Sequence, residues 1–554
     1  MKGPGARDRR IAVIGAGPRA FFAVERLVAR GRAASTRARV RIDAFDPAPA
    51  GAGEEYDVAQ PDYLRLTIPA GLVDAWVRTG ETPSPEGEVA FGGWLPPAGD
   101  GWRYDVFPPR ALVGQYLCDA GSRLRDQLPG GWELVHHGRR VSSLVPCEGG
   151  RWSVHGTYYD EVLVCSRLGA SWSGSLQGHW SDSKPLIGDP SPVGLRLGER
   201  QIRAGASVGV RGAGRTFLDV LLALTEGRGG VFEPGGRPHR MVYRRSGRDV
   251  AVVYPFSRTG RFPEVVPTPD AVPAHAGLDE ARHDALVSIA ASGEDADRTE
   301  RIALETARLY LERARAASGA PISHDEARVA VDDCFAQLHR TALERGLDPR
   351  VELERSVRVA LGEEPLGPEW ALGQAWRDLH LAMSAQFTRA GAGADARRPF
   401  WECAVVMQPL TFGPAPINGV KLLALIAGGV VDPRSLVGPS LDAGGVSWPD
   451  TLVMPEPRID VIVDAVGPPP GYREQRQELL DRLVEEGHVR LAEGRAGIEI
   501  TEDARAVGRD GSPTPGLSCL GRLVEDVEIG DQVLVRQPDD VAERWASRIA
   551  SGWF

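Results

Sequence analysis

Cysteine is scarce in this chain, and its few copies are far apart. The six cysteines stand at positions 118, 147, 165, 334, 403 and 519, and no two form a Cys-x-x-Cys pair. This spacing argues against a disulfide framework, a zinc site and a redox-active disulfide. We therefore expect no metal centre, and we predict a reduced, cytoplasmic protein.

Long apolar runs and basic tracts are also missing. No apolar segment approaches the length of a membrane span, and residues 1–5 lack the core of a signal peptide. The 65 Lys and Arg residues stand against 75 Asp and Glu residues, which gives a net charge of −10. Neither a membrane nor a nucleic acid is an expected partner.

A dinucleotide-binding pattern lies close to the N-terminus. The apolar run of residues 10–14 ends in Gly-Ala-Gly-Pro-Arg-Ala and continues into residues 21–27, which have helical spacing. In a strand–turn–helix unit of this kind, the glycines permit a tight turn and close approach of a pyrophosphate, and the helix N-terminus receives the phosphates. The predicted cofactor contacts are Gly15, Gly17, Pro18, Arg19 and Ala20.

An acidic residue supports this interpretation. Residues 40–46 have the pattern of a second strand that ends in Asp46. A carboxylate at that point hydrogen-bonds a ribose hydroxyl and favours an adenosine without a 2′-phosphate, as in FAD or NAD. The alternative is an ordinary βαβ unit without a ligand.

A second dinucleotide turn follows a strand-like run at residues 207–211. Gly212 and Gly214 lead into apolar residues 217–224 with helical spacing. The predicted contacts of this turn are Gly212, Gly214, Arg215 and Thr216.

Two arginines suggest which nucleotide this second half binds. The next strand-like run, residues 239–243, is followed by Arg244 and Arg245. Arginine at the end of a second strand suits the 2′-phosphate of NADPH. The alternative is a solvated arginine cluster in a loop.

The rest of the chain completes an α/β prediction. Residues 141–145, 151–155 and 161–165 have the pattern of three short strands, and residues 278–400 are rich in helical spacing. We predict two Rossmann-like dinucleotide-binding domains, as in two-dinucleotide-binding flavoproteins, with an α-helical insertion. The predicted division is an FAD-binding domain at 1–190, an NADPH-binding domain at 191–275, a helical substrate domain at 276–400, and a return to the first domain at 401–554.

Several longer motifs point to a family. They lie at residues 15–19, 46–53, 107–117, 210–220, 224–230, 254–261 and 513–522. As a set, they resemble the FAD/NAD(P)-binding protein family related to single-component flavin N-monooxygenases, in particular the nitrosuccinate synthases. The resemblance spans nearly the whole chain apart from the helical insertion, and we add Val141 and Gly521 to the predicted cofactor contacts.

The resemblance implies an activity. It implies FAD and NADPH as cofactors and O2 and a small amino acid as substrates. The amine of aspartate would be oxidised by a flavin hydroperoxide toward a nitrosuccinate-type product, in specialised-metabolite biosynthesis. Three turns depart from the usual flavoprotein pattern: residues 165–169 replace Ala-Thr-Gly, residues 464–467 form its later counterpart, and residues 530–533 replace Gly-Asn-Asp-Thr.

The two carboxylates of such a substrate would need fixed cations. Arg258 and Arg261 are the first candidates, because they follow the second dinucleotide half among aromatic residues. Equally open are a structural ion pair and a second contact to the NADPH phosphate. Lys421 is a weaker candidate.

Two other functions stay open at this point. One is an FAD/NADPH oxidoreductase that acts on carbon or simply oxidises NADPH. The other is a non-catalytic dinucleotide-binding protein. The sequence also leaves a homodimer open.

Overall fold

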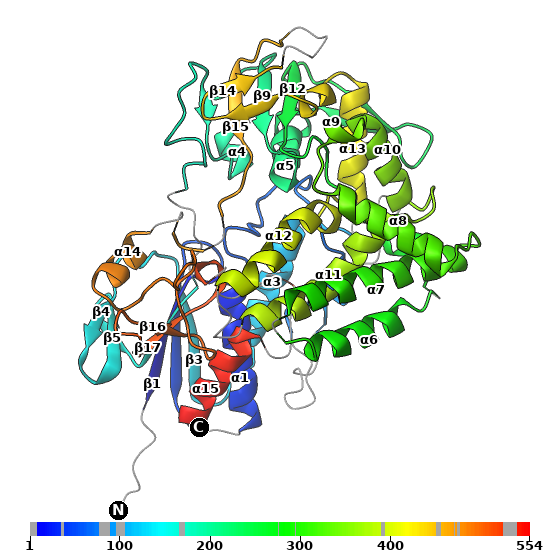
Figure 1. The fold of residues 1–554 in the computed structure, drawn as a ribbon. Coiled ribbons are helices and arrows are strands. Elements are labelled where there is room, and N and C mark those ends of the chain that lie inside the picture. Colours follow the sequence, from blue (N-terminus) through cyan, green and yellow to red (C-terminus); the bar gives the residue numbers. More distant parts are fainter. Residues whose placement is uncertain are drawn as a thin grey trace, which may run out of the picture.

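The computed structural model describes most of the chain as two α/β units and a helical region (Figure 1). The described residues are 8–34, 38–76, 89–95, 106–165, 172–274, 276–293, 295–388, 394–449, 456–469, 471–473, 477–524, 534 and 540–553. In Figure 1 the six-stranded and the four-stranded sheet lie at opposite ends of the molecule, and the green helices lie beside them. This arrangement confirms the predicted fold class.

The first sheet has the strand order β16-β17-β7-β1-β2-β3. Its strands are parallel except for β16, which runs antiparallel to β17. Apolar residues of β1 and β7 are buried, as expected for strands paired on both edges and covered on both faces. The strands are β1 (Arg9–Ile14), β2 (Val40–Phe45), β3 (Trp132–His137), β7 (Glu161–Val164), β16 (Arg505–Val507) and β17 (Pro513–Cys519).

Three long helices cover this sheet: α1 (Pro18–Ala33), α3 (Arg110–Asp126) and α15 (Val541–Trp553). The C-terminal helix α15 packs against α1. It is also tied to the sheet, because Trp545 donates its indole N–H to buried Glu161 at 3.1 Å. The two ends of the described chain therefore meet in one domain.

A small antiparallel sheet corrects the predicted strand positions. It consists of β4 (Val145–Cys147), β5 (Arg151–Val154) and β6 (Thr157–Tyr159). The strand predicted at 141–145 begins only at Val145, and the one predicted at 161–165 is β7 of the main sheet. The strand β6 was not predicted. His155 and Gly156, with φ of 49° and 80°, form a two-residue hairpin turn that lets β6 pair with β5.

The second sheet has the order β12-β9-β15-β8, and all its strands are parallel. They are β8 (Leu186–Ile187), β9 (Ser207–Arg211), β12 (Val252–Phe256) and β15 (Val461–Asp464). The helices α4 (Val193–Arg196), α5 (Arg215–Leu224) and α13 (Pro416–Ala427) belong to this part of the fold, with the hairpin β10 (Val231–Pro234) and β11 (Met241–Arg244).

Two sheet memberships differ from the predicted division. We predicted that residues 401–554 return to the first domain, but β15 belongs to the second sheet. We also predicted that residues 1–190 belong to the first domain, but β8 lies in the second sheet. A short, fully buried apolar strand such as β15 can pair in either sheet, so its local sequence does not decide between them.

The region between these strands is helical, and polar residues begin several of its helices. Asp295 and Asp348 accept hydrogen bonds at the N-termini of their helices, and Ser323 forms a capping box with Glu326. A substrate role for this region stays a prediction. Its helices are α6 (Leu278–Ala290), α7 (Ala296–Ala317), α8 (His324–Gln337), α9 (Ala342–Arg345), α10 (Pro349–Ala360), α11 (Pro368–Thr388) and α12 (Ala394–Thr411).

The remaining named elements are short. They are α2 (Phe91–Trp94), α14 (Glu478–Glu485), β13 (Ser440–Asp442) and β14 (Gly445–Ser447). All six cysteines are free thiols. Within the described ranges, no single helix is long and apolar enough to cross a membrane. The helices Arg398–Thr411 and Pro416–Ala427 meet these two criteria only when taken together, and they are bent by 74° relative to each other.

Candidate functional site: two glycine turns

The first glycine turn lies where the strand order of the first sheet reverses. β1 has β2 on one side and β7 on the other, and the turn of Gly15 and Gly17 follows its carboxyl end. The Gly15 N–H donates to the Phe45 carbonyl at 2.9 Å, and the φ of Gly15 is 93°. Gly17 is the N-cap residue of α1, and no side chain among the described residues caps that helix. An uncapped helix N-terminus at such a switch point is suited to phosphate binding.

A glycine-rich loop covers this turn. The Gly51 N–H donates to the Ala16 carbonyl at 2.7 Å. A Cβ on Gly53 would lie 3.0 Å from the Gly17 Cα, and Gly53 has a φ of 61°. The loop and the turn can therefore approach so closely only because both carry glycine.

Asp46 directly follows β2, as predicted, and one of its carboxylate oxygens bonds to the turn. One oxygen accepts from the Ala16 N–H and the other from the Ala48 N–H, each at 2.8 Å. A carboxylate has about four lone-pair directions, so about two remain for ribose hydroxyls. The residue is half-buried and fits the predicted role.

Gly521 and Val141 are the other predicted contacts of this half. Gly521 follows β17 with a φ of 76°, and a Cβ there would lie 3.5 Å from the Arg19 side chain. Val141 is buried in the segment after β3. Near it, the Arg139 guanidinium lies 5.6 Å from the centre of the Phe45 ring. The Gly15 turn, Asp46 and Gly521 therefore lie beyond the carboxyl ends of three parallel strands, at one edge of the first sheet.

The second glycine turn has the same geometry. β9 lies between β12 and β15, and Gly212 follows its carboxyl end with a φ of 106°. A Cβ on Gly212 would lie 3.1 Å from the Ala465 carbonyl oxygen, so the turn needs glycine. Gly214 is the N-cap residue of α5, again without a side-chain cap among the described residues. Arg215 and Thr216 form the first turn of that helix.

A comparison of the two turns identifies the end of each second strand. The Gly212 N–H donates to the Phe256 carbonyl at 2.7 Å, as Gly15 does to Phe45. Asp46 follows Phe45, whereas Ser257 and Arg258 follow Phe256. The position of Asp46 in the first half is thus taken by Ser257 in the second, and Arg258 is the next residue. The Arg258 side chain is exposed and has no partner within the described ranges.

The prediction for Arg244 and Arg245 is wrong in its placement. β11, which ends at Arg244, pairs antiparallel with β10 and does not join the parallel sheet. Arg244 instead pairs with Glu233 at 2.6 Å. Arg245 donates to the Val250 and Ala251 carbonyls at 2.9 Å each, directly before β12. It therefore lies at the amino edge of the sheet, opposite the Gly212 turn. The prediction took β11 for the second strand of this half, but β11 belongs to a hairpin with β10. The strand that pairs with β9 in the parallel sheet is β12.

Arg258 and Arg261 do not form a common clamp either. Arg258 is exposed, but Arg261 is only 9% exposed and lies near Glu264 and Arg345. Burial lowers the pKa of Arg261, and the charge of Glu264 opposes that shift. The cavity that Arg261 lines has a volume of about 10 Å³, room for about one water molecule. It does not admit an amino diacid.

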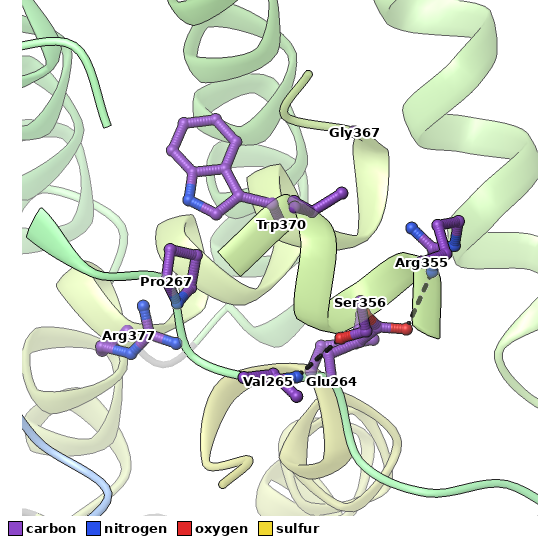
Figure 2. Close-up of a pocket in the computed structure, with 10 residues that line it drawn as sticks. Glu264, Val265, Pro267, Arg355, Ser356, Gly367, Trp370 and Arg377 are labelled. Carbon is purple, nitrogen blue, oxygen red and sulfur yellow. Dashed lines mark hydrogen bonds and ion pairs between the residues drawn. The ribbon is translucent and has the colours of Figure 1, made fainter. Parts of the chain in front are cut away.

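A neighbouring cavity of similar size shows how these charges are held (Figure 2). Arg355 pairs with Glu264 at 3.0 Å, and the Val265 N–H donates to the Ser356 hydroxyl at 2.7 Å. Burial raises the pKa of Glu264, and Arg355 counters that rise. This buried cluster joins the segment after β12 to the helical region, and Arg261 lies close to it. Lys421 is also buried, and it is paired with Glu226.

The three departing turns are only partly described. The Cys165 N–H donates to the Ile14 carbonyl at 2.8 Å, while residues 166–169 and 530–533 lie outside the described residues. Asp464 is fully buried and accepts from Ser175 at 2.8 Å and from Arg211 at 3.0 Å. It fixes the strand end on which the Gly212 turn packs.

Comparisons with known proteins agree with this geometry. Residues 12–165 match the FAD-NAD(P)-binding family. The chain is 25% identical to nitrosuccinic acid synthase of Aspergillus oryzae, over 88% of this chain and 82% of that protein. It is 27% identical to a nitrosuccinate-forming L-aspartate N-monooxygenase of Streptomyces cremeus, over 46% of this chain and 42% of that protein.

Among solved structures, L-lysine 6-monooxygenase of Pseudomonas syringae aligns over 99% of both chains, with 14% identity and a TM-score of 0.45. The family match and the curated relatives confirm the resemblance found in the sequence motifs. The family match at residues 12–165 includes the first glycine turn and Asp46.

Proposed function

We propose that the protein is an FAD- and NADPH-dependent monooxygenase that oxidises the amine of aspartate toward a nitrosuccinate-type product. The observation that supports the cofactor part of the proposal is the pair of glycine turns. The first turn bonds to the end of the strand that precedes Asp46, and the second bonds to the end of the strand that precedes Ser257 and Arg258. The substrate part is supported by the relatives, which are named for that reaction. The role in specialised-metabolite biosynthesis belongs to the same proposal.

The first turn would hold FAD. Glycines at positions 15, 17 and 53 keep the backbone open to a pyrophosphate, and Asp46 keeps acceptor capacity for a ribose. FAD would supply the redox and oxygen chemistry, and the protein would supply placement and exclusion of water.

The second turn would hold NADPH. We assign the 2′-phosphate to Arg258, in place of Arg244 and Arg245, because Arg258 follows the strand that receives the Gly212 hydrogen bond. A guanidinium can bind a phosphate through two parallel hydrogen bonds. The carboxylate that stands in the first half would repel the same group.

The activity can be tested by NADPH consumption with a panel of amino acids and mass analysis of the products. We expect aspartate to stimulate NADPH oxidation and to yield an N-oxidised diacid. Stimulation by neutral or basic amines alone would overturn the substrate. Release of all reducing equivalents as hydrogen peroxide, with every amine, would favour an NADPH oxidase instead.

We expect Asp46→Ala to weaken FAD binding by about ten- to a hundredfold, on the order of 1.5–3 kcal/mol. The change removes the ribose acceptor and also the partners of the Ala16 and Ala48 N–H groups. Fluorescence titration of the apoprotein with FAD measures the effect. Asp46→Asn is the control. Its FAD affinity should lie between those of the wild type and Asp46→Ala, because one acceptor oxygen remains. An unchanged FAD affinity in Asp46→Ala would contradict the assignment.

A further inference from the structure

Two ion pairs cross from the first domain to helix α5 of the second. Arg110 is the first residue of α3, and its guanidinium lies 2.9 and 3.0 Å from the two carboxylate oxygens of Asp219. One turn earlier on α5, Arg215 lies 3.6 Å from Glu55. Residues four apart share a face of a helix, so Arg215 and Asp219 present one charged face to the first domain.

The Arg110–Asp219 pair is buried and held from the side of the first domain. The two side chains are 8% and 12% exposed. The Arg110 N–H donates to the Leu64 carbonyl at 2.8 Å, and its Nε donates to the Arg65 carbonyl at 3.3 Å. The guanidinium therefore has a fixed position, and the position of Asp219 follows from it.

Both residues come from sequence motifs to which the proposed activity gives no role. Arg110 ends the Phe-Pro-Pro-Arg run, and Asp219 stands in the Thr-Phe-Leu-Asp run directly after the second glycine turn. Asp219 lies one helical turn beyond Arg215 on the helix whose N-terminus would receive NADPH. Glu55 lies two residues beyond Gly53, which packs on the turn that would receive FAD.

We propose that Arg110 and Asp219 are positioning residues that set the nicotinamide half against the flavin half for hydride transfer. This inference rests on the proposed function. Hydride transfer needs the reacting atoms about 3–3.5 Å apart, and a misplacement of about 1 Å can cost on the order of a hundredfold in rate. The buried Arg110–Asp219 pair would hold α5 at a fixed distance from the first domain. Moving α5 away would separate the two charges and leave each of them unpaired in the protein interior, which is costly.

The test compares Asp219→Asn, which keeps the shape but removes the charge, with Arg248→Gln. The control variant breaks an exposed ion pair, Arg248 with Glu199, within the second domain. Anaerobic rapid mixing with NADPH gives the limiting rate of flavin reduction and the Kd of NADPH. Hydrogen exchange of the α5 backbone in the protein without cofactors gives a readout that is independent of turnover.

In Asp219→Asn we expect a limiting rate about ten- to a hundredfold lower, a Kd within about threefold, and faster exchange along α5. Arg248→Gln should behave as the wild type, and the swap of Arg110→Asp with Asp219→Arg should regain part of the rate. A purely structural role would lower stability and leave the limiting rate unchanged, which would overturn the proposal.

A milder variant covers the case in which Asp219→Asn does not fold. Glu55→Gln removes the half-exposed outer pair and should slow reduction by about two- to fivefold; a wild-type rate would overturn the proposal. If NADPH does not reduce the wild-type flavin, the proposed function fails. The exchange measurement then decides alone: faster exchange along α5 in either variant supports the docking role, and unchanged exchange overturns it.

Discussion

Reversing the charge of residue 258, in Arg258→Glu, is expected to lower the preference for NADPH over NADH by about a hundredfold or more. Arg258 follows the strand end that accepts the hydrogen bond of the Gly212 N–H, and its exposed side chain has no partner in the described part of the chain. Loss of an arginine–phosphate contact costs about 1.5–3 kcal/mol, and a carboxylate facing the 2′-phosphate adds repulsion. NADH lacks that phosphate, so its binding should change little.

Arg244→Glu is the matched control for this prediction. Arg244 is also an exposed arginine of the second domain, but it lies on the β10–β11 hairpin and pairs with Glu233. The ratio of kcat/KM for the two nicotinamide cofactors should therefore stay near the wild-type value in Arg244→Glu. If Arg244→Glu collapses the ratio while Arg258→Glu preserves it, the assignment from the sheet topology is wrong.

The parts of the site that could be predicted are those specified by adjacent residues. The strand, the Gly15–Gly17 turn, the helix and Asp46 lie within about forty residues, and each has a local backbone reason for its residue type. The same holds for Gly212 and Gly214. Such short-range patterns predict both the turns and the phosphate-binding role, whatever the rest of the chain does.

The second strand of the second half could not be identified in the same way. An antiparallel hairpin strand and a parallel strand of this length have similar apolar patterns, and only the pairing separates β11 from β12. One local signal was available. Phe45 precedes Asp46, and Phe256 precedes Ser257, so the two halves share an aromatic residue directly before the ribose position.

The burial of charged side chains also could not be predicted from the sequence. Arg258 and Arg261 are three residues apart and look alike in sequence, yet one is exposed and the other lies in a cavity among glutamates and arginines. That difference comes from helices α9 to α11, which are more than eighty residues away along the chain. Only the tertiary structure shows that Arg261 lines a cavity with room for about one water molecule.

Gly114→Ala is expected to destabilise the protein by about 3 kcal/mol and to weaken FAD binding, although alanine is normally favoured over glycine in a helix. A Cβ at position 114 of α3 would lie 1.8 Å from the Tyr56 carbonyl oxygen. Tyr56 is itself buried, so the segment that follows Gly53 has no room to retreat. The strain should therefore pass to the loop that covers the first glycine turn.

Gly121→Ala on the same helix is the matched control. Its Cβ would lie 3.5 Å from the Ala50 carbonyl oxygen, an ordinary contact, so it should be neutral or stabilising by about 0.5–1 kcal/mol. Denaturant unfolding measures the stability of both variants, and FAD titration measures the site. Because helix propensity changes equally in the two, a difference between them isolates the contact of α3 with the loop. Equal stability and equal FAD affinity in both variants would show that this close contact does not hold the turn.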